Sequence, residues 1–390
     1  MTHAQEDLMH DDAGDVGRPD GGPETVAPTE TAAQTEAAAG TEVVAETEVA
    51  APAEAAARNN VVAGTQVSAA SPAASGESGR ARYAYLGPEG TFTEAALLQV
   101  TDADESDLLP CLDVVTALEL VRGGGADFAV VPIENSVEGG VNVTLDTLST
   151  GSPLVIVGEM LVPIAFVLAA RADMTLDRVR RVSTHPHAWA QCRGWVAKNL
   201  DGAVHVPATS TAAAAALLAA GAPDPGFDAA LSAPLSAQKY GLTVLAEGVA
   251  DNAHAVTRFV LVSRPGYVPE KTGADKTTLL VHLPDNEAGA LLSMLEQFAT
   301  RGVNLSRIES RPIGDSLGRY SFSIDVEGHV AEERVQATLI GLHRVCPMVR
   351  FLGSYPRADG QKPHVHPGTH DADFRAARAW VADLLAGVTV

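Results

Sequence analysis

The sequence has little of what several large classes of protein need. Its three cysteines, Cys111, Cys192 and Cys346, are widely spaced and odd in number, which excludes a disulfide framework. The longest strongly apolar stretch, residues 160–170, is interrupted by Pro163 and is shorter than the roughly 20 residues of a membrane-spanning helix. The N-terminus lacks the basic and apolar segments of a secretory signal. These absences favour a soluble cytoplasmic protein without a membrane partner.

Basic charge is also scarce, since the formal net charge is −22. Half of this excess lies in residues 1–80, which hold 14 acidic and 3 basic residues. No cluster of lysine and arginine resembles the footprint of a nucleic-acid-binding protein. We therefore expect no nucleic-acid partner.

Motifs that bind nucleotides or metals are missing as well. There is no P-loop, no G-x-G-x-x-G after a strand and no G-x-S-x-G elbow. His185, His187 and Cys192 lie close together, but Pro186 separates the histidines, and zinc sites have tighter, paired spacings. The sequence predicts neither a metal nor a cofactor.

What is present is an alternation of short apolar runs and amphipathic stretches. From residue 82 onward, strands and helices alternate as in an α/β domain, and a later block reads βαββαβ, the ferredoxin-like order. The composition before residue 82 is too polar and repetitive to bury a core. The chain divides into five parts: a disordered acidic low-complexity tail (1–80), an α/β domain (82–265), a linker (266–275), a βαββαβ domain (276–357) and a C-terminal tail with a helix (358–390).

Hydroxyl and amide side chains recur where helices are expected to begin. A helix start offers free N–H groups and a partial positive charge, so it binds carboxylate or phosphate without a basic side chain. The alternative, that these residues are ordinary helix caps, stays open. The four groups are Thr91 and Thr93, Asn135 and Ser136, Ser183 and Thr184, and the run Thr209, Ser210 and Thr211.

Two strand ends carry polar residues that favour chemistry. In VVPIENSVEGG, Glu134 could transfer a proton and Asn135 could orient a substrate, or Asn135 and Ser136 could simply satisfy loop backbone groups. In AVTRFVLV, Thr257 and Arg258 precede an apolar run. From the residues alone, a strand with a polar approach explains AVTRFVLV equally well.

Taken together, the motifs YLGPEGTFTEAA, VVPIENSVEGGV, THPHAWAQC, TSTAAAA, AALSAPLSAQKYGL and NAHAVTRFVLV resemble those of prephenate dehydratases in order and spacing. The βαββαβ block, with GALLSML and IESRP, is similar to the regulatory ACT domain of the same enzymes. The resemblance covers residues 82–357.

The resemblance implies a fold and a reaction. The fold would be an α/β two-lobed, periplasmic-binding-protein-like catalytic domain followed by a ferredoxin-like ACT domain. Lobe one would take residues 82–157 and 245–265, lobe two residues 158–244, with the site in the cleft between them. The reaction would convert prephenate to phenylpyruvate with loss of CO2 and water, on the route to phenylalanine. It needs no redox cofactor, and aromatisation supplies its driving force.

The resemblance also assigns residues. It makes Thr257, Glu134 and Asn135 catalytic, and it lists as substrate-binding Arg258, Phe259, Thr184, Gln191, Ser210 and Thr211. Arg258 would either meet a substrate carboxylate or brace the site. Some family members carry a glutamate where this chain has Ala208, so a carboxylate there cannot be obligatory here.

In the ACT block, the resemblance implies a site for L-phenylalanine between subunits of a dimer or tetramer, and feedback inhibition through it. The effector-binding residues would be Gly289, Ala290, Leu291, Asn304, Leu305, Glu309, Ser310, Arg311 and Pro312. Two alternatives remain: an arogenate dehydratase, and a non-catalytic amino-acid sensor of the same fold.

Overall fold

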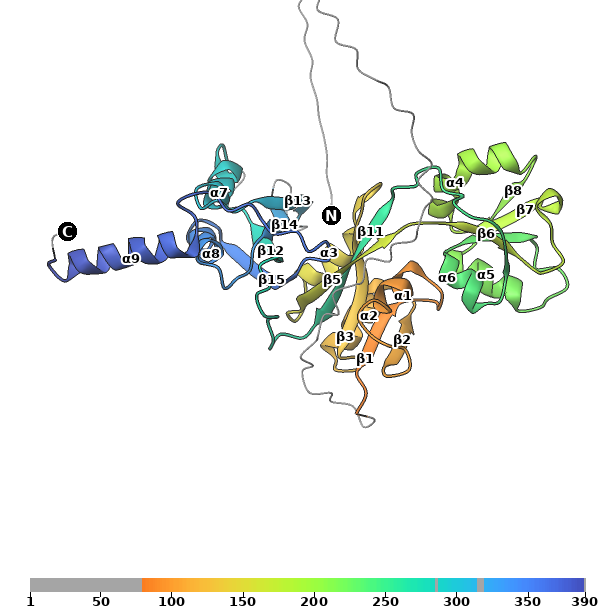
Figure 1. Cartoon of the computed structure of the whole chain (residues 1–390), viewed down its shortest axis with the longest axis horizontal. Helices are drawn as coiled ribbons and strands as arrows, with labels where there is room; N and C mark the ends of the chain where they lie inside the picture. The colour runs from red at the N-terminus through yellow and green to blue at the C-terminus, as the bar shows by residue number, and fades with distance from the viewer. Residues whose placement is uncertain (1–78, 285–286, 314–318, 389–390) are drawn as a thin grey trace, which may run out of the picture. The chain divides into compact units, whose positions relative to one another are not determined.

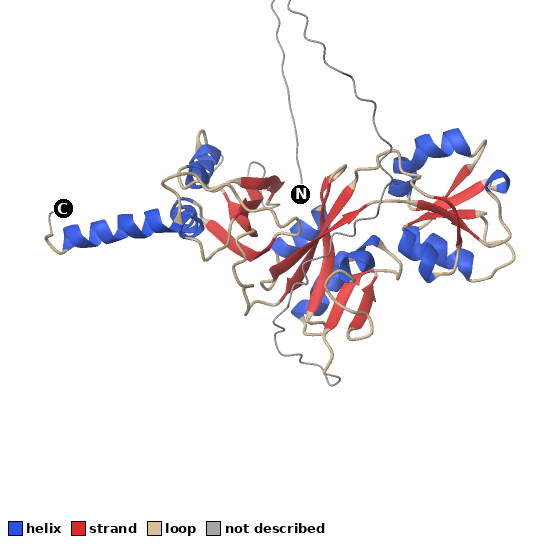
Figure 2. Cartoon of the chain, viewed as in Figure 1, coloured by secondary structure: helices blue, strands red, loops and turns tan. Residues whose placement is uncertain are grey.

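A computed structural model describes residues 79–284, 287–313 and 319–388 of the chain (Figure 1). The disordered tail predicted for residues 1–80 lies, apart from its last two residues, outside these ranges. The described residues form three sheets with helices packed alongside them (Figure 2). No helix among them is both long and apolar enough to cross a membrane.

The first sheet has the strand order β2-β1-β3-β11-β5, with the two-residue β4 paired to β3. Strands β1, β2 and β3 are parallel, whereas β11 runs antiparallel to both of its neighbours, β3 and β5. Its elements are β1 (Arg82–Leu86), α1 (Phe92–Leu97), β2 (Asp107–Cys111), α2 (Val114–Arg122), β3 (Phe128–Asn135), β4 (Gly139–Gly140), α3 (Asn142–Ser149), β5 (Val155–Pro163) and β11 (Val256–Ser263).

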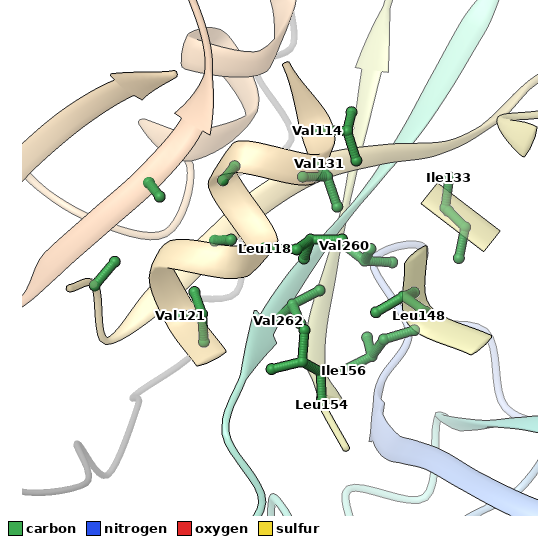
Figure 3. Close-up of a cluster of buried hydrophobic side chains, with 14 of the residues drawn as sticks. Val114, Leu118, Val121, Val131, Ile133, Leu148, Leu154, Ile156, Val260 and Val262 are labelled. Carbon is green, nitrogen blue, oxygen red and sulfur yellow. The ribbon is translucent and has the colours of Figure 1, made fainter. Parts of the chain in front are cut away.

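Strand β11 sends alternate side chains to the two faces of this sheet, as the two-residue period of a strand requires. Val260 and Val262 pack in the cluster formed with α2 and α3, which Figure 3 shows. Phe259 and Leu261 pack on the other face, in the cluster that contains α1. This alternation decides where the polar residues at the start of β11 point.

The second sheet has the order β10-β6-β9-β7-β8. The sequence suggested that lobe two covers residues 158–244. Strand β5 continues in the first sheet to Pro163, and β10 keeps Ala246 in the second sheet, so both ends of lobe two lie further along the chain than the sequence suggested. Its elements are β6 (Val167–Ala170), the 3-10 helix η1 (Leu176–Arg178), β7 (Arg181–Thr184), α4 (Pro186–Asn199), β8 (Val204–Pro207), α5 (Thr211–Ala219), β9 (Ala229–Ser232), α6 (Pro234–Lys239) and β10 (Thr243–Ala246).

The third sheet is antiparallel, in the order β13-β14-β12-β15, and its elements follow one another as βαββαβ. Its apolar face packs on α7 and α8. The elements are β12 (Asp275–His282), α7 (Ala290–Ala299), β13 (Leu305–Pro312), β14 (Tyr320–Glu327), α8 (Glu333–Val345) and β15 (Met348–Pro356), and α9 (Asp371–Leu385) follows them.

Strand β15 of the third sheet packs directly on β5 of the first. Gly353 has a φ of +137°, and a Cβ at this position would clash with the backbone carbonyl of Ile156. Tyr355, two residues further on, is fully buried in the cluster of α2 and α3. The third sheet therefore packs against β5 and β11, the two strands that pair with each other at Thr257.

Candidate active site

A cavity of about 340 Å³ is lined by residues of both the first and the second sheet's elements. This size is typical of small-molecule sites. No aspartate, glutamate, lysine or arginine belongs to the described lining. Its hydroxyl groups come from Thr91, Thr93, Thr209, Ser210, Thr211 and Thr257.

Three helices begin at this cavity. Thr91 caps α1 by accepting from the backbone N–H of Glu94 at 3.3 Å, and Ser210 caps α5 by accepting from that of Ala213 at 2.9 Å. His185, which also lines the cavity, caps α4. Two of the four groups that the sequence singled out, Thr91 with Thr93 and the run Thr209 to Thr211, therefore lie at helix starts of this cavity. Asn135 also lines the cavity, but it ends β3, and α3 begins only at Asn142. Helix starts around an uncharged lining favour an anionic ligand.

Thr257 and Asn135 form the most defined polar pair in the cavity. They lie opposite each other in the β3–β11 ladder, and Asn135 Nδ2 donates to Thr257 Oγ1 at 2.8 Å. Asn135 Oδ1 accepts from the backbone N–H groups of Val137 at 2.8 Å and Glu138 at 3.2 Å, which fixes the orientation of the amide. Because Thr257 Oγ1 accepts from Asn135, its own hydrogen is free to donate into the cavity.

Arg258 and Glu134 do not line this cavity. Thr257 and Phe259 face it, so Arg258, between them on the strand, points to the opposite side of the sheet. There Arg258 is 5% exposed and forms ion pairs with Glu159, with Asp325 and, at 3.4 Å, with Glu134, so Glu134 contacts the arginine and not the ligand space. Burial alone would lower the pKa of Arg258, but the charges of Asp325 and Glu159 and the nearby Tyr355 raise it well above its usual value. Of the two roles that the sequence left open for Arg258, the geometry favours the brace.

Thr184, predicted to bind substrate, also lies away from the cavity lining. It is fully buried in β7, and its hydroxyl donates to the carbonyl of Leu231 at 2.7 Å. Gln191, one and a half turns into α4, does line the cavity. The hydroxyl of Thr184 therefore supports the second sheet, whereas the amide of Gln191 faces the cavity.

Sequence reasoning placed Phe259 in the site, but it missed the other two rings of the aromatic wall and two contacts that join the sheets beside the cavity. Phe92 of α1 and Phe166 meet edge to face, with ring centroids 5.4 Å apart, and both line the cavity. His187 Nδ1 lies 2.9 Å from Glu138 Oε1. On another side, Ser236 Oγ donates to the carbonyl of Gly90 at 2.6 Å. Phe92 lies inside the motif GTFTEAA, from which only the hydroxyl residues Thr91 and Thr93 were predicted to contribute to a site.

Neither a metal site nor a reactive thiol is indicated among the residues that the structure describes. Within the described ranges no group of three or more His, Cys, Asp or Glu side chains is placed to hold a metal ion. Cys192 is fully buried, and burial raises the pKa of its thiol to about 12. A thiolate nucleophile at this position is therefore disfavoured near neutral pH.

The predicted effector residues lie on β13, just before it, and at the start of α7. Gly289, with a φ of +92°, is the N-cap of α7. Two side chains of β13 contact the first sheet's elements: Glu309 Oε1 accepts from the N–H of Gly140 at 2.8 Å, and Arg311 pairs with Asp146 at 2.7 Å. The remaining predicted residues are Ala290, Leu291, Asn304, Leu305, Ser310 and Pro312, of which Leu291, Asn304, Ser310 and Pro312 are exposed.

Comparisons with known proteins agree with one another on this architecture. The prephenate dehydratase family model matches residues 83–266. A prephenate dehydratase of Amycolatopsis methanolica is 47% identical over 79% of this chain and 99% of its own length. The crystal structure of an Arthrobacter aurescens prephenate dehydratase in complex with L-Phe is 57% identical, covers 78% of this chain and 99% of its own, and has a TM-score of 0.74. A structure named GqqA, a quorum quenching acylase, is 32% identical over 70% of this chain and 97% of its own, with a TM-score of 0.63. This chain belongs to the prephenate dehydratase family.

Proposed function

We propose that the cavity binds prephenate and that Thr257 assists the departure of its ring hydroxyl. The hydrogen bond from Asn135 to Thr257 carries this proposal, because it leaves the Thr257 hydroxyl as a donor. In the reaction, the bond between the ring and its carboxylate breaks, and CO2 leaves. The electron pair of that bond enters the ring as the carbon–oxygen bond breaks. The departing hydroxide takes the proton of the Thr257 hydroxyl to become water, and Thr257 regains a proton from solvent.

Charge accumulates on the departing oxygen only as the carbon–oxygen bond lengthens. A hydrogen bond from Thr257 therefore strengthens toward the transition state, which is the condition for lowering the barrier. Thr257 is 7% exposed, so little water reaches its hydroxyl to compete for the hydrogen bond to the departing oxygen. Aromatisation supplies the driving force, and the protein has mainly to orient the substrate and to stabilise its leaving group.

The two substrate carboxylates would be held without a basic side chain. Helix starts at Thr91 and Ser210, together with the amide of Gln191 and the hydroxyl of Thr211, provide the donors. Phe259 and the other rings of the wall provide an apolar surface for the six-membered ring. The first two sheets would then be the two lobes of a periplasmic-binding-protein-like domain.

We propose that the third sheet, with α7 and α8, is an ACT domain that binds L-phenylalanine. Its βαββαβ order is the ferredoxin-like plan. The Arthrobacter aurescens relative carries L-Phe, and the residues that we propose for the effector are the β13 and α7 set given above. We further propose that two copies pair through this domain and share the effector site.

A turnover assay tests both parts of the function. The purified protein should convert prephenate to phenylpyruvate faster than it converts arogenate, and saturating L-phenylalanine should lower the rate. Turnover of neither substrate would favour a sensor, and preference for arogenate would change the assignment of the substrate. If L-phenylalanine changed neither the rate nor the sedimentation profile, the effector site would be refuted.

Asn135→Asp tests the direction of the hydrogen bond. A carboxylate can still accept from Val137 and Glu138, but it makes Thr257 the donor and occupies the hydrogen that the substrate needs. We expect kcat to fall at least about 10-fold, which corresponds to about 1.4 kcal/mol of barrier. Steady-state kinetics measure this, and an unchanged thermal midpoint is the control. An Asn135→Asp enzyme with full kcat would show that Thr257 does not act as a donor.

A further inference from the structure

A cluster of charged side chains lies between the first and third sheets, on the face opposite the cavity. Five members are 9% exposed or less, and they alternate in sign. Such a cluster holds its geometry tightly, because rotating one member removes a partner from another buried charge. The members are Glu159 of β5, Arg258 of β11, Lys276 of β12, Arg307 of β13 and Asp325 of β14.

Arg258 is the member of this cluster that connects it to the active site, because Arg258 directly follows Thr257 in β11. Its Nε donates to Glu159 at 2.6 Å, one Nη to Asp325, and the other to the Tyr355 hydroxyl at 2.7 Å. Arg258 also donates to Glu134 of β3 at 3.4 Å, so two of its four contacts come from the third sheet. The backbone of β11 beside Thr257 is thus held in part by side chains that lie outside the first sheet.

A second route leads from Asp325 to the other member of the polar pair. Asp325 accepts from Arg307 Nε at 2.9 Å, and Arg307 in turn pairs with Glu309 at 2.9 Å. Glu309 accepts from the N–H of Gly140, and Gly140 pairs with Glu134 in the short β4–β3 ladder that ends at Asn135. Asp325 is therefore linked to both strands that hold the Asn135–Thr257 bond.

We propose that Asp325 is a positioning residue for the reaction, acting through Arg258 on Thr257 and through Arg307 and Glu309 on Asn135. The role rests on the proposed function of the cavity. Asp325 is fully buried and touches no residue of the cavity lining by any bond described above, so its effect is on geometry alone. Burial would raise the pKa of Asp325, but Arg258 and Arg307 hold it far below its usual value, so the carboxylate stays ionised.

The test compares Asp325→Asn with Asp127→Asn in the full chain. Asp127 is a matched control because it is 6% exposed and also pairs with two arginines, Arg82 at 3.2 Å and Arg264 at 3.6 Å. It lies just before β3, beside the far end of β11 from Thr257. Both substitutions keep the shape of the side chain and remove its charge. The readouts are kcat, KM, the thermal midpoint and amide hydrogen exchange.

For Asp325→Asn we expect kcat to fall about 10-fold or more with KM within about twofold, because geometry and not substrate affinity changes. Exchange should become faster in residues 134–140 and 256–259. For Asp127→Asn we expect kcat within about twofold, even at a comparable loss of thermal midpoint. Exchange should become faster only near residues 126–131 and at Arg82, whose backbone N–H donates to Asp127.

Several results would overturn the positioning role. They are unchanged exchange at residues 256–259 in Asp325→Asn, a fall in kcat that follows the thermal midpoint equally in both variants, and a rise in KM at constant kcat. Absence of prephenate turnover by the unaltered enzyme would refute the proposed function instead. The exchange comparison would then still decide whether Asp325 fixes Thr257 and Asn135.

Discussion

Replacement of Thr257 by alanine is expected to lower kcat for prephenate by about 100- to 10,000-fold, the range that a positioned proton donor contributes. KM should change by no more than about threefold, because the hydroxyl acts on an oxygen whose charge develops only in the transition state. The substitution also leaves Asn135 Nδ2 without its acceptor, which is 2.8 Å away in the unaltered enzyme. Steady-state formation of phenylpyruvate measures the effect.

Thr257→Ser is the matched control for this prediction. Serine keeps the hydroxyl and loses only the methyl group, so we expect it to retain kcat within about 10-fold, a difference of about 1.4 kcal/mol in barrier. A valine at the same position keeps the shape without the hydroxyl and should resemble alanine. Equal rates for the alanine variant and the unaltered enzyme would remove Thr257 from the mechanism.

The sequence was sufficient to predict the strands and helices around the site, because each carries a local signal. Strand β3, Phe128–Asn135, contains a run of buried apolar residues, and Asp113 caps α2 by accepting from the backbone N–H of Thr116. The resemblance assigned Ser210 and Thr211 to the substrate, but from the residues alone Thr91, Ser210 and Thr211 share only the property of lying at expected helix starts. Their meeting depends on contacts between two sheets, which no local pattern encodes.

The side to which Arg258 points shows where sequence reasoning ends. The strand period already places Arg258 opposite Thr257, but it does not say which of the two faces the ligand space. Its partner Asp325 lies 67 residues further along the chain, and its partner Glu159 lies 99 residues before it. A buried brace and a substrate clamp have the same local sequence, so only the packing of the third sheet on the first distinguishes them.

Removal of the Arg258 side chain is expected to have the largest effect on stability. Arg258→Met keeps much of the length of the side chain but leaves the buried Glu159 and Asp325 with one cationic partner each, Lys276 and Arg307. We expect the free energy of unfolding at pH 7 to fall by about 3 kcal/mol, the lower end of the range for breaking a buried pair. Urea unfolding followed by circular dichroism measures it.

The pH dependence of this loss separates charge from packing. Burial raises the pKa of Asp325 and of Glu159, but the charge of Arg258, together with that of Arg307 at Asp325 and of Lys276 at Glu159, outweighs burial and lowers both pKa values below their usual range. A carboxylate with a lowered pKa in the folded state contributes stability above its unfolded pKa, and that contribution is lost as the pH falls. Without Arg258 both carboxylates take up protons more readily, so the difference between Arg258→Met and the unaltered enzyme should be largest at pH 7. It should shrink as the pH falls below about 5, toward the unfolded pKa values of Asp and Glu.

The control for this pH series is Arg311→Met, which breaks an ion pair between the same two sheets' elements. Arg311 and Asp146 have side chains that are 32% and 55% exposed, so solvent screens their attraction. An exposed pair contributes about 0–1 kcal/mol, and we expect a loss in that range with little dependence on pH. If the loss for Arg258→Met were equally large at every pH, Arg258 would stabilise the junction through the packing of its stem and not through its charge. The charge of Asp325 would then not position Thr257 through Arg258. The same series of unfolding measurements at different pH therefore also tests whether the third sheet positions Thr257 through charge.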